Sequence, residues 1–334
     1  MNNSQIAAIV ALATSLLLGI VLYKIFIPLL RKVKLGQKIL EIGPSWHKCK
    51  EGTPNLGGLF FIVACIFGYI LGTLFLVSRN VIVADENYYL STLTLLGLAL
   101  SQGIIGFVDD YVKLFKKRNK GLSSSQKLVL QFITVAVYLY VNAHFNGFDT
   151  VIKFPWGSTV DLGLFYYFFM LLGIAYIINC ANLTDGIDGL AGSVALIVCV
   201  TFLLFGLNGG GISFIVPTAA LCGGLVAFLI FNFHPAKIFM GDTGSLFLGG
   251  FIVGIVMLTK NEFVLLPVSC IWIIEGLSVI IQVISFKCTG KRVFKMSPIH
   301  HHFEKCDWSE VKIVAVFSAV TVLFSAVSYY LLII

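Results

Sequence analysis

The feature that most restricts the fold of this chain is a series of long apolar segments joined by short linkers. A helix needs roughly 20 mostly apolar residues to cross a bilayer. Ten segments meet this requirement, at residues 5–30, 55–78, 90–109, 126–145, 162–181, 188–206, 212–232, 242–259, 263–286 and 310–333. The sequence therefore predicts an all-α polytopic membrane protein that forms one integral membrane domain over residues 1–334.

The composition agrees with membrane insertion and argues against other classes of protein. Only 12% of the residues are charged, whereas soluble domains carry about a quarter. The net charge is +7, but the basic residues are gathered in linkers, so we expect the lipid bilayer and no nucleic acid as a partner. The eight cysteines form no CxxC pair, which argues against a zinc knuckle or a disulfide framework.

The distribution of basic residues predicts the orientation of the chain. Of the 23 lysines and arginines, 18 lie in the first, third, seventh and ninth linkers, and only Arg79, Lys153 and Lys260 lie in even-numbered linkers. Basic residues close to membrane helices stay in the cytoplasm. We therefore expect the odd-numbered linkers to face inward and both termini to face outward.

The fourth linker differs from the others because it contains two short runs typical of strands. Residues 151–154 and 159–162 flank the turn-like sequence Pro155-Trp-Gly-Ser. We expect a small exterior β-hairpin near residues 148–163.

Acids stand between the fifth and sixth segments, where a buried stretch would carry none. Asn182, Asp185 and Asp188 follow one another at intervals of three, which on a helix would place them on one face. Gly186 and Gly189 remove side-chain bulk beside the acids and let a ligand or another backbone approach. Carboxylates at a membrane edge are costly and are functional candidates. The simpler alternative is an acidic turn between two helices.

A second acidic group closes the third segment. Asp109 and Asp110 are adjacent, and Lys113 follows three residues later. Neighbouring side chains on a helix point about 100° apart, so the two acids can have separate tasks. One could bind a cation or accept a proton while the other orients Lys113. The alternative is a local ion pair at a helix end, which would contribute little.

The seventh linker carries a fifth acid between glycines. Pro235 is expected to end the seventh helix, and Asp242 stands where the eighth begins. Asp242 could be an ordinary N-cap that contributes about 1 kcal/mol. The sequence Gly241-Asp-Thr-Gly also suits a carboxylate that lies close to a phosphate–metal complex at a helix N-terminus.

Histidines and a further lysine complete the polar residues of the inward linkers. His300, His301 and His302 are adjacent, whereas metal ligands on a helix usually stand three or four residues apart, so we favour contact with phosphate or substrate over zinc. Lys50 precedes a Gly-Thr-Pro turn in the first linker. It could contact an anion or could be a solvated cytoplasmic lysine.

These groups together predict phosphoryl-transfer chemistry at one membrane face. Oxygen ligands of this kind suit Mg²⁺, and Mg²⁺ with lysines neutralises phosphate charge in a transition state. The chain has no GxxxxGK[ST] loop and no GxSxG motif, which argues against a P-loop nucleotidase and a serine hydrolase. A cation transporter is the alternative from another class. It would need acids through the depth of the membrane, and only Glu275, inside the ninth segment, fits that pattern.

The motifs resemble those of the polyprenyl-phosphate N-acetylhexosamine-1-phosphate transferases. The matching stretches are 109–113, 182–192, 232–245 and 298–304, in order along nearly the whole chain. Residues 52–58 and 298–304 are most similar to the branch that acts in bacterial peptidoglycan synthesis. At Asn55-Leu56 the chain departs from the Thr-Met that the family more often has.

The resemblance implies a Mg²⁺-dependent, multi-pass enzyme of the bacterial cytoplasmic membrane, usually a homodimer, with its active site on the cytoplasmic side. Such an enzyme would transfer phospho-MurNAc-pentapeptide from UDP-MurNAc-pentapeptide to undecaprenyl phosphate and release UMP. The alternative within the family is a transferase that uses UDP-N-acetylglucosamine.

The resemblance also implies roles for individual residues. Asp242 would be a direct Mg²⁺ ligand and would act in catalysis with Asp109 and Asp110. The expected substrate-binding residues are Lys50, Lys113, Lys127, Asn182, Asp185, Asp188, Asn232, Phe239, His300, His301 and His302. Among these, Phe239 could stack on uracil because an aromatic face suits a base.

Overall fold

The structure is a computed structural model that describes residues 1–32, 52–83, 85–115 and 121–333. Its long helices are α1 (Asn3–Lys32), α2 (Gly57–Ser78), α3 (Glu86–Phe115), α4 (Ser124–Phe145), α5 (Leu164–Thr184), α6 (Leu190–Phe205), α7 (Ile212–Asn232), α8 (Gly241–Met257), α10 (Cys270–Thr289) and α12 (Glu310–Ile333). The short elements are β1 (Val151–Lys153), β2 (Thr159–Asp161), η2 (Gly206–Gly210), η3 (Glu262–Val264), α9 (Leu265–Val268) and α11 (Ile299–Glu304).

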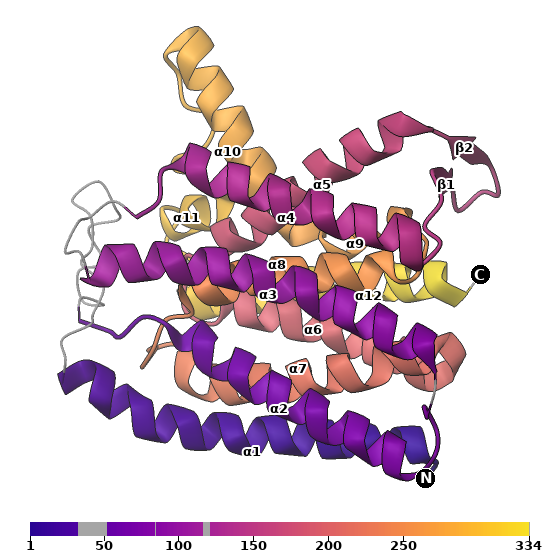
Figure 1. The fold of residues 1–334 in the computed structure, drawn as a ribbon. Coiled ribbons are helices and arrows are strands. Elements are labelled where there is room, and N and C mark those ends of the chain that lie inside the picture. The colour runs from indigo at the N-terminus through magenta and orange to yellow at the C-terminus, as the bar shows by residue number, and fades with distance from the viewer. Residues whose placement is uncertain (33–51, 84, 116–120, 334) are drawn as a thin grey trace.

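The structure confirms the predicted all-α membrane fold. Within the described residues, nine helices are long and apolar enough to cross a membrane. The eighth predicted segment, residues 242–259, corresponds to α8, which has 17 residues and is shorter than a typical span. Both termini lie at one end of the bundle, and the C-terminal end of α3 lies at the other (Figure 1). The side of the membrane that each end faces stays a prediction.

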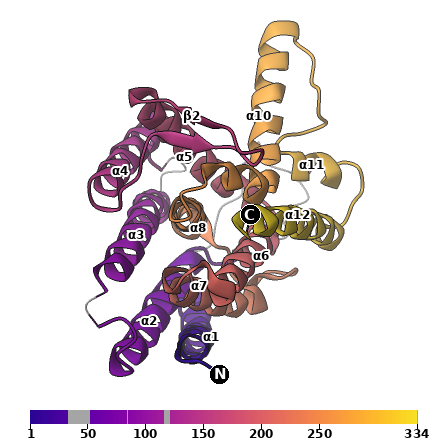
Figure 2. The same cartoon turned by 90° about the vertical axis from the view of Figure 1, so that its right-hand side faces the viewer.

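The short helix α8 forms the centre of the bundle. Every residue from Thr243 to Met257 is buried, and α3, α5, α6 and α7 surround this helix in the end-on view (Figure 2). Glycines allow the close packing: a Cβ at Gly249 would lie 2.8 Å from the Cα of Ile178 in α5, and one at Gly250 would lie 3.0 Å from the Cα of Ala99 in α3. Small residues are what membrane helices use to approach one another.

The ninth predicted segment is broken. Residues 263–286 are predicted as one helix, but the chain makes η3 and α9, passes Ser269 and restarts as α10. Pro267 has no backbone N–H and cannot take part in a continuous helix ladder. After the break, α10 leaves the bundle and stands apart from the other helices in both views (Figures 1 and 2).

The predicted hairpin is present between α4 and α5. Strands β1 and β2 pair antiparallel with Val151 opposite Asp161 and Lys153 opposite Thr159. The side chain of Thr150 bonds the Asp161 carboxylate at 2.5 Å, and Phe154 stacks on Trp156 across the turn. These contacts hold the hairpin together outside the helix bundle.

Candidate active site

The site is organised around the carboxylate of Asp242 on the first turn of α8. Its Oδ2 lies 2.9 Å from Lys113 Nζ and 2.6 Å from Lys127 Nζ. Its Oδ1 accepts a hydrogen bond from Asn182 Nδ2 at 2.9 Å, and the same amide nitrogen lies 2.8 Å from Ser245 Oγ. Four predicted site residues from α3, α4, α5 and α8 therefore meet at one carboxylate.

Asp109 shares both lysines with Asp242. It is almost fully buried, and its Oδ2 lies 2.5 Å from Lys113 Nζ and 3.3 Å from Lys127 Nζ. Its Oδ1 accepts the backbone N–H of Leu122 at 2.7 Å, which ties the segment before α4 to α3. The lysines thus bridge two carboxylates in a partly buried setting, where charges interact more strongly than in water.

Asp110 has a different task from its neighbour, because it caps the N-terminus of α8. Its Oδ1 accepts the N–H of Asp242 at 3.2 Å, and its Oδ2 accepts the N–H and Oγ1–H of Thr243 at 2.9 and 2.7 Å. The alternative that Asp242 is the N-cap is wrong, because the N-cap position is Met240, which makes no side-chain cap bond. The cap comes instead from another helix.

A glycine on α3 makes this cap possible. A Cβ at Gly106 would overlap the backbone carbonyl of Asp242, so any larger residue would separate the two helices. The N-terminal end of α8 carries a partial positive charge. The close approach therefore places a carboxylate, a helix N-terminus and two lysines within one compact polar group.

Asp185 and Asp188 do not share a helical face, and that prediction is wrong. α5 ends at Thr184 and α6 begins at Leu190, so both acids lie in the turn between the helices. Gly189, with φ of 83°, starts α6 in the left-handed region that glycine adopts without strain. Of the two glycines that suggested close approach, Gly189 therefore also marks where the second helix begins.

Asp185 lies where negative charge accumulates. Burial raises its pKa well above the ordinary range, and the carboxylates of Asp242, Asp110 and Asp188 raise the pKa further, whereas a backbone hydrogen bond from Gly241 opposes these effects. A cation or another positive group would relieve this repulsion. The turn is therefore suited to a ligand that brings positive charge or that is bound through a metal ion.

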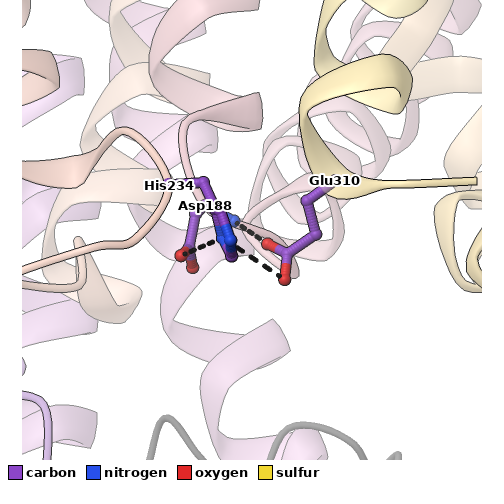
Figure 3. A group of neighbouring side chains, drawn as sticks. All are labelled: Asp188, His234 and Glu310. Carbon is purple, nitrogen blue, oxygen red and sulfur yellow. Dashed lines mark hydrogen bonds and ion pairs between the residues drawn. The ribbon is translucent and has the colours of Figure 1, made fainter.

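Asp188 joins a second polar cluster, with His234 and Glu310 (Figure 3). Its Oδ2 lies 3.2 Å from His234 Nδ1 and accepts the N–H of Ala236 at 3.0 Å. His234 Nδ1 is also 3.8 Å from Glu310 Oε1, and Glu310 Oε2 accepts the backbone N–H of Asp188 at 3.0 Å. This cluster ties the start of α12 to the α5–α6 turn and to the loop after α7.

Asn232 braces the same two loops through its amide. Its Oδ1 accepts the N–H of Gly189 at 2.9 Å, and its Nδ2 donates to the carbonyl of Ile238 at 2.9 Å. Phe239 is half-buried nearby, and its N–H donates to Pro54 O at 2.9 Å. The predicted contacts of Asn232 and Phe239 with substrate stay predictions.

The histidines occupy three different environments on α11. His301 Nδ1 pairs with Glu304 Oε2 at 2.5 Å, and His302 Nδ1 accepts the N–H of Lys295 at 3.1 Å. His300 is fully buried, with Nδ1 3.0 Å from Glu275 Oε1. Adjacent positions on one short helix therefore do not form a common metal site. Lys50 lies outside the described residues.

The three carboxylates around the start of α8 form a donor set that fits Mg²⁺. Asp109, Asp110 and Asp242 each offer one carboxylate oxygen, and these atoms lie within 4.8 Å of one another. Carboxylate oxygens are the ligands that Mg²⁺ prefers. Both oxygens of Asp110 accept hydrogen bonds from the start of α8, whereas the Oδ2 atoms of Asp242 and Asp109 face lysine ammonium groups, whose positive charge a cation could replace. Asp242 and Asp109 are therefore the better donors. The two lysine nitrogens at Asp242 Oδ2 show that this position attracts positive charge.

Some residues of the site are absent from the sequence-based prediction. His234 stands within the quoted 232–245 stretch and Glu310 stands at the start of the last segment, but neither belongs to a spacing pattern. Ser245, which contacts Asn182, has no signal beyond its place in Gly244-Ser245. The proline after His234 was the only local sign that this loop has a special shape.

Comparison with known proteins places this chain in a family. The sequence profile of Glycosyl transferase family 4 matches residues 90–260, which include the helices that carry the acids. The Phospho-N-acetylmuramoyl-pentapeptide-transferase of Shouchella clausii is 43% identical over 94% of this chain and 94% of its own length. The enzymes of the same name from Geobacillus kaustophilus and Clostridium perfringens are each 43% identical, over 97% and 96% of this chain and 98% and 97% of their own lengths. The chain belongs to the phospho-N-acetylmuramoyl-pentapeptide-transferase family, within glycosyl transferase family 4.

Proposed function

We propose that this protein transfers phospho-MurNAc-pentapeptide from UDP-MurNAc-pentapeptide to undecaprenyl phosphate. The products are UMP and the first lipid-linked precursor of peptidoglycan. The family membership supports this reaction, because relatives that are named for this transferase are similar to the chain over nearly their whole length.

The observation that carries the proposal is the arrangement around Asp242. Two lysines, the buried carboxylate of Asp109 and an amide converge from three helices on Asp242 of a fourth. Two phosphate-bearing substrates repel each other, and positive charge is needed to bring them together. Lys113 and Lys127 supply that charge, and Asn182 holds the Asp242 carboxylate in place.

Mg²⁺ completes this arrangement in the proposal, held by Asp242 and Asp109. When bound, it neutralises charge on the pyrophosphate oxygens of the donor. The residues of the chain then have distinct tasks: Lys113 and Lys127 bind phosphate oxygens, and Asp110 fixes α8 so that Asp242 points at the reacting group. Phe239 stacks on the uracil ring of the donor.

The surroundings of the site suit one lipid substrate and one aqueous substrate. The polar cluster lies at helix ends, and α10 stands away from the bundle with an apolar surface that includes the exposed Ile281, Ile284 and Phe286. In our proposal this end faces the cytoplasm, so that the nucleotide enters from water and undecaprenyl phosphate enters from the bilayer. The enzyme works in the cytoplasmic membrane as a homodimer.

Purified protein in detergent or nanodiscs, supplied with undecaprenyl phosphate and Mg²⁺, tests the reaction directly. UMP release and a lipid-linked product are expected with UDP-MurNAc-pentapeptide and not with UDP-N-acetylglucosamine. Chelation by EDTA is expected to stop the reaction, and added Mg²⁺ to restore it. If UDP-N-acetylglucosamine is turned over and UDP-MurNAc-pentapeptide is not, the enzyme belongs functionally with the transferases that use UDP-N-acetylglucosamine.

A further inference from the structure

Glu275 and His300 form a buried pair that has no role in the reaction described so far. Glu275 lies on α10 and His300 lies on α11, both are fully buried, and His300 Nδ1 is 3.0 Å from Glu275 Oε1. Among the described residues, the remaining atoms, His300 Nε2 and Glu275 Oε2, have no hydrogen-bond partner. Removing either partner would leave the other polar group buried and alone, which is costly.

The opposite edge of the His300 ring rests on the turn that carries the acids. A Cβ built on Gly186 would overlap His300 Nε2, and its distance to Cε1 would be 2.6 Å. The imidazole therefore fills the space that a side chain at position 186 would need. Gly186 follows Asp185 directly, so the position of the ring fixes the path of the backbone beside that acid.

The other end of the pair is held by a close helix crossing. A Cβ at Gly276 would overlap Cys180 Sγ, and Tyr176 Oη donates to the carbonyl of Ile273 at 3.3 Å. These contacts set the position of α10 against α5, and hence the position of Glu275. The helix α10 leaves the bundle beyond this point (Figure 2), so the Glu275–His300 contact is where its base meets the α5–α6 turn through α11.

We propose that Glu275 is a positioning residue for the transfer reaction: by accepting the Nδ1–H of His300, it holds the imidazole against Gly186 and fixes the turn that presents Asp185 and Asp188 to the donor nucleotide. This inference rests on the proposed function. It assigns no chemical step to Glu275, which acts only through His300. Loss of Glu275 is therefore expected to weaken binding of the donor nucleotide, because the α5–α6 turn, and not α10, carries the acids.

Two substitutions of similar size separate this role from packing. Glu275→Gln keeps an oxygen that can accept the His300 hydrogen bond, whereas Glu275→Met fills the space without an acceptor. We expect Glu275→Met to raise the KM for UDP-MurNAc-pentapeptide by about 10- to 100-fold, as small misplacements in active sites do. The KM for undecaprenyl phosphate is expected to stay near that of the wild type, and Glu275→Gln is expected to keep donor KM near that of the wild type. The Tm of Glu275→Met is expected to fall, because His300 stays buried without its partner, so the difference between the two KM values carries the test.

Gly186→Ala tests the same contact from the other side. If the imidazole transmits the effect, Gly186→Ala raises donor KM, and combining it with Glu275→Met adds little, because contacting residues in one network are not additive. Gly173→Ala on α5, where a Cβ meets nothing within 4 Å, is the matched control for the glycine. Glu262→Gln is the control for the acid, because Glu262 bonds Tyr166 at the far end of α5.

The outcomes decide between the inference and its competitors. Unchanged donor KM in both Glu275→Met and Gly186→Ala overturns it, as does a parallel rise of the KM for the donor and the KM for undecaprenyl phosphate, which a merely structural role predicts. Full additivity of the two substitutions also overturns it. If Glu275→Met does not fold, Gly186→Ala decides alone. A wild-type protein that binds UMP but makes no lipid product would instead contradict the proposed function.

Discussion

The carboxylate of Asp110 on α3 receives the backbone N–H of Thr243 at 2.9 Å and the hydroxyl of the same residue at 2.7 Å. A residue of one membrane helix thereby caps another, and it does so beside Asp242, the proposed catalytic carboxylate. The cap is buried, so its loss cannot be compensated by water. We therefore expect substitution of Asp110 to change both stability and activity.

Asp110→Ala is expected to lower the free energy of unfolding by about 1–2 kcal/mol, the range for the loss of an N-cap. Thr243→Val removes only the hydroxyl bond and should cost less. Thermal unfolding of the purified proteins measures both. If Asp110→Ala were as stable as the wild type, the cap would not contribute to the fold.

Asp242→Asn is expected to abolish Mg²⁺-dependent UMP release while the protein stays folded in the membrane. The amide keeps the size of the side chain but removes the charge that the two lysines and the cation share. Glu262→Gln, the same change from acid to amide at the far end of α5, is the comparison variant and should retain most activity. Turnover by Asp242→Asn at the wild-type level would reject Asp242 as the metal ligand.

The two lysines should differ in importance. Lys127 is 16% exposed and Lys113 is 40% exposed, so Lys127 interacts with Asp242 in a drier environment. We expect Lys127→Met to reduce kcat/KM by more than Lys113→Met, with both losses at or above about 100-fold, as for charge-stabilising groups in active sites. Steady-state kinetics with varied donor would show this order, and the reverse order would contradict it.

The fold could be predicted largely from the sequence because hydropathy over 20 residues reports membrane helices directly. The break at Ser269 could not be predicted, since Pro267 was compatible with either a kink or a stop. The prediction of a shared helical face for Asp185 and Asp188 failed because α5 ends at Thr184, before both acids, and α6 begins only after Gly189. Local spacing alone cannot distinguish a helix from a turn that contains two glycines.

The site residues were predictable as a set but not in their tasks. The acids and lysines around Asp242 were named from motifs and from the family resemblance. The capping role of Asp110 depends on the contact of α3 with α8 at Gly106, which no sequence pattern encodes. The same holds for Glu310, which reaches Asp188 from more than a hundred positions along the chain.

The cluster of Asp188, His234 and Glu310 should contribute modestly to stability. His234 is 45% exposed, and exposed charged pairs typically contribute less than about 1 kcal/mol. Glu310→Gln and His234→Gln, alone and together, form a double-mutant cycle that measures their coupling from thermal unfolding. A coupling energy well above that limit would show that the cluster holds the start of α12 more strongly than the exposure of His234 indicates.

The raised pKa of Asp185 predicts how stability depends on pH when chelator is present. Because the folded protein holds a proton that the unfolded chain releases, the stabilisation is fully present below the unfolded pKa of about 3.9 and is lost as pH rises through the raised folded pKa. Asp185→Asn cannot ionise, so its Tm should vary less with pH over that range. Differential scanning fluorimetry in EDTA across this pH range compares the two proteins. Identical pH profiles would show that Asp185 is as easily ionised in the folded protein as in water. They would contradict the conclusion that negative charge accumulates at this turn.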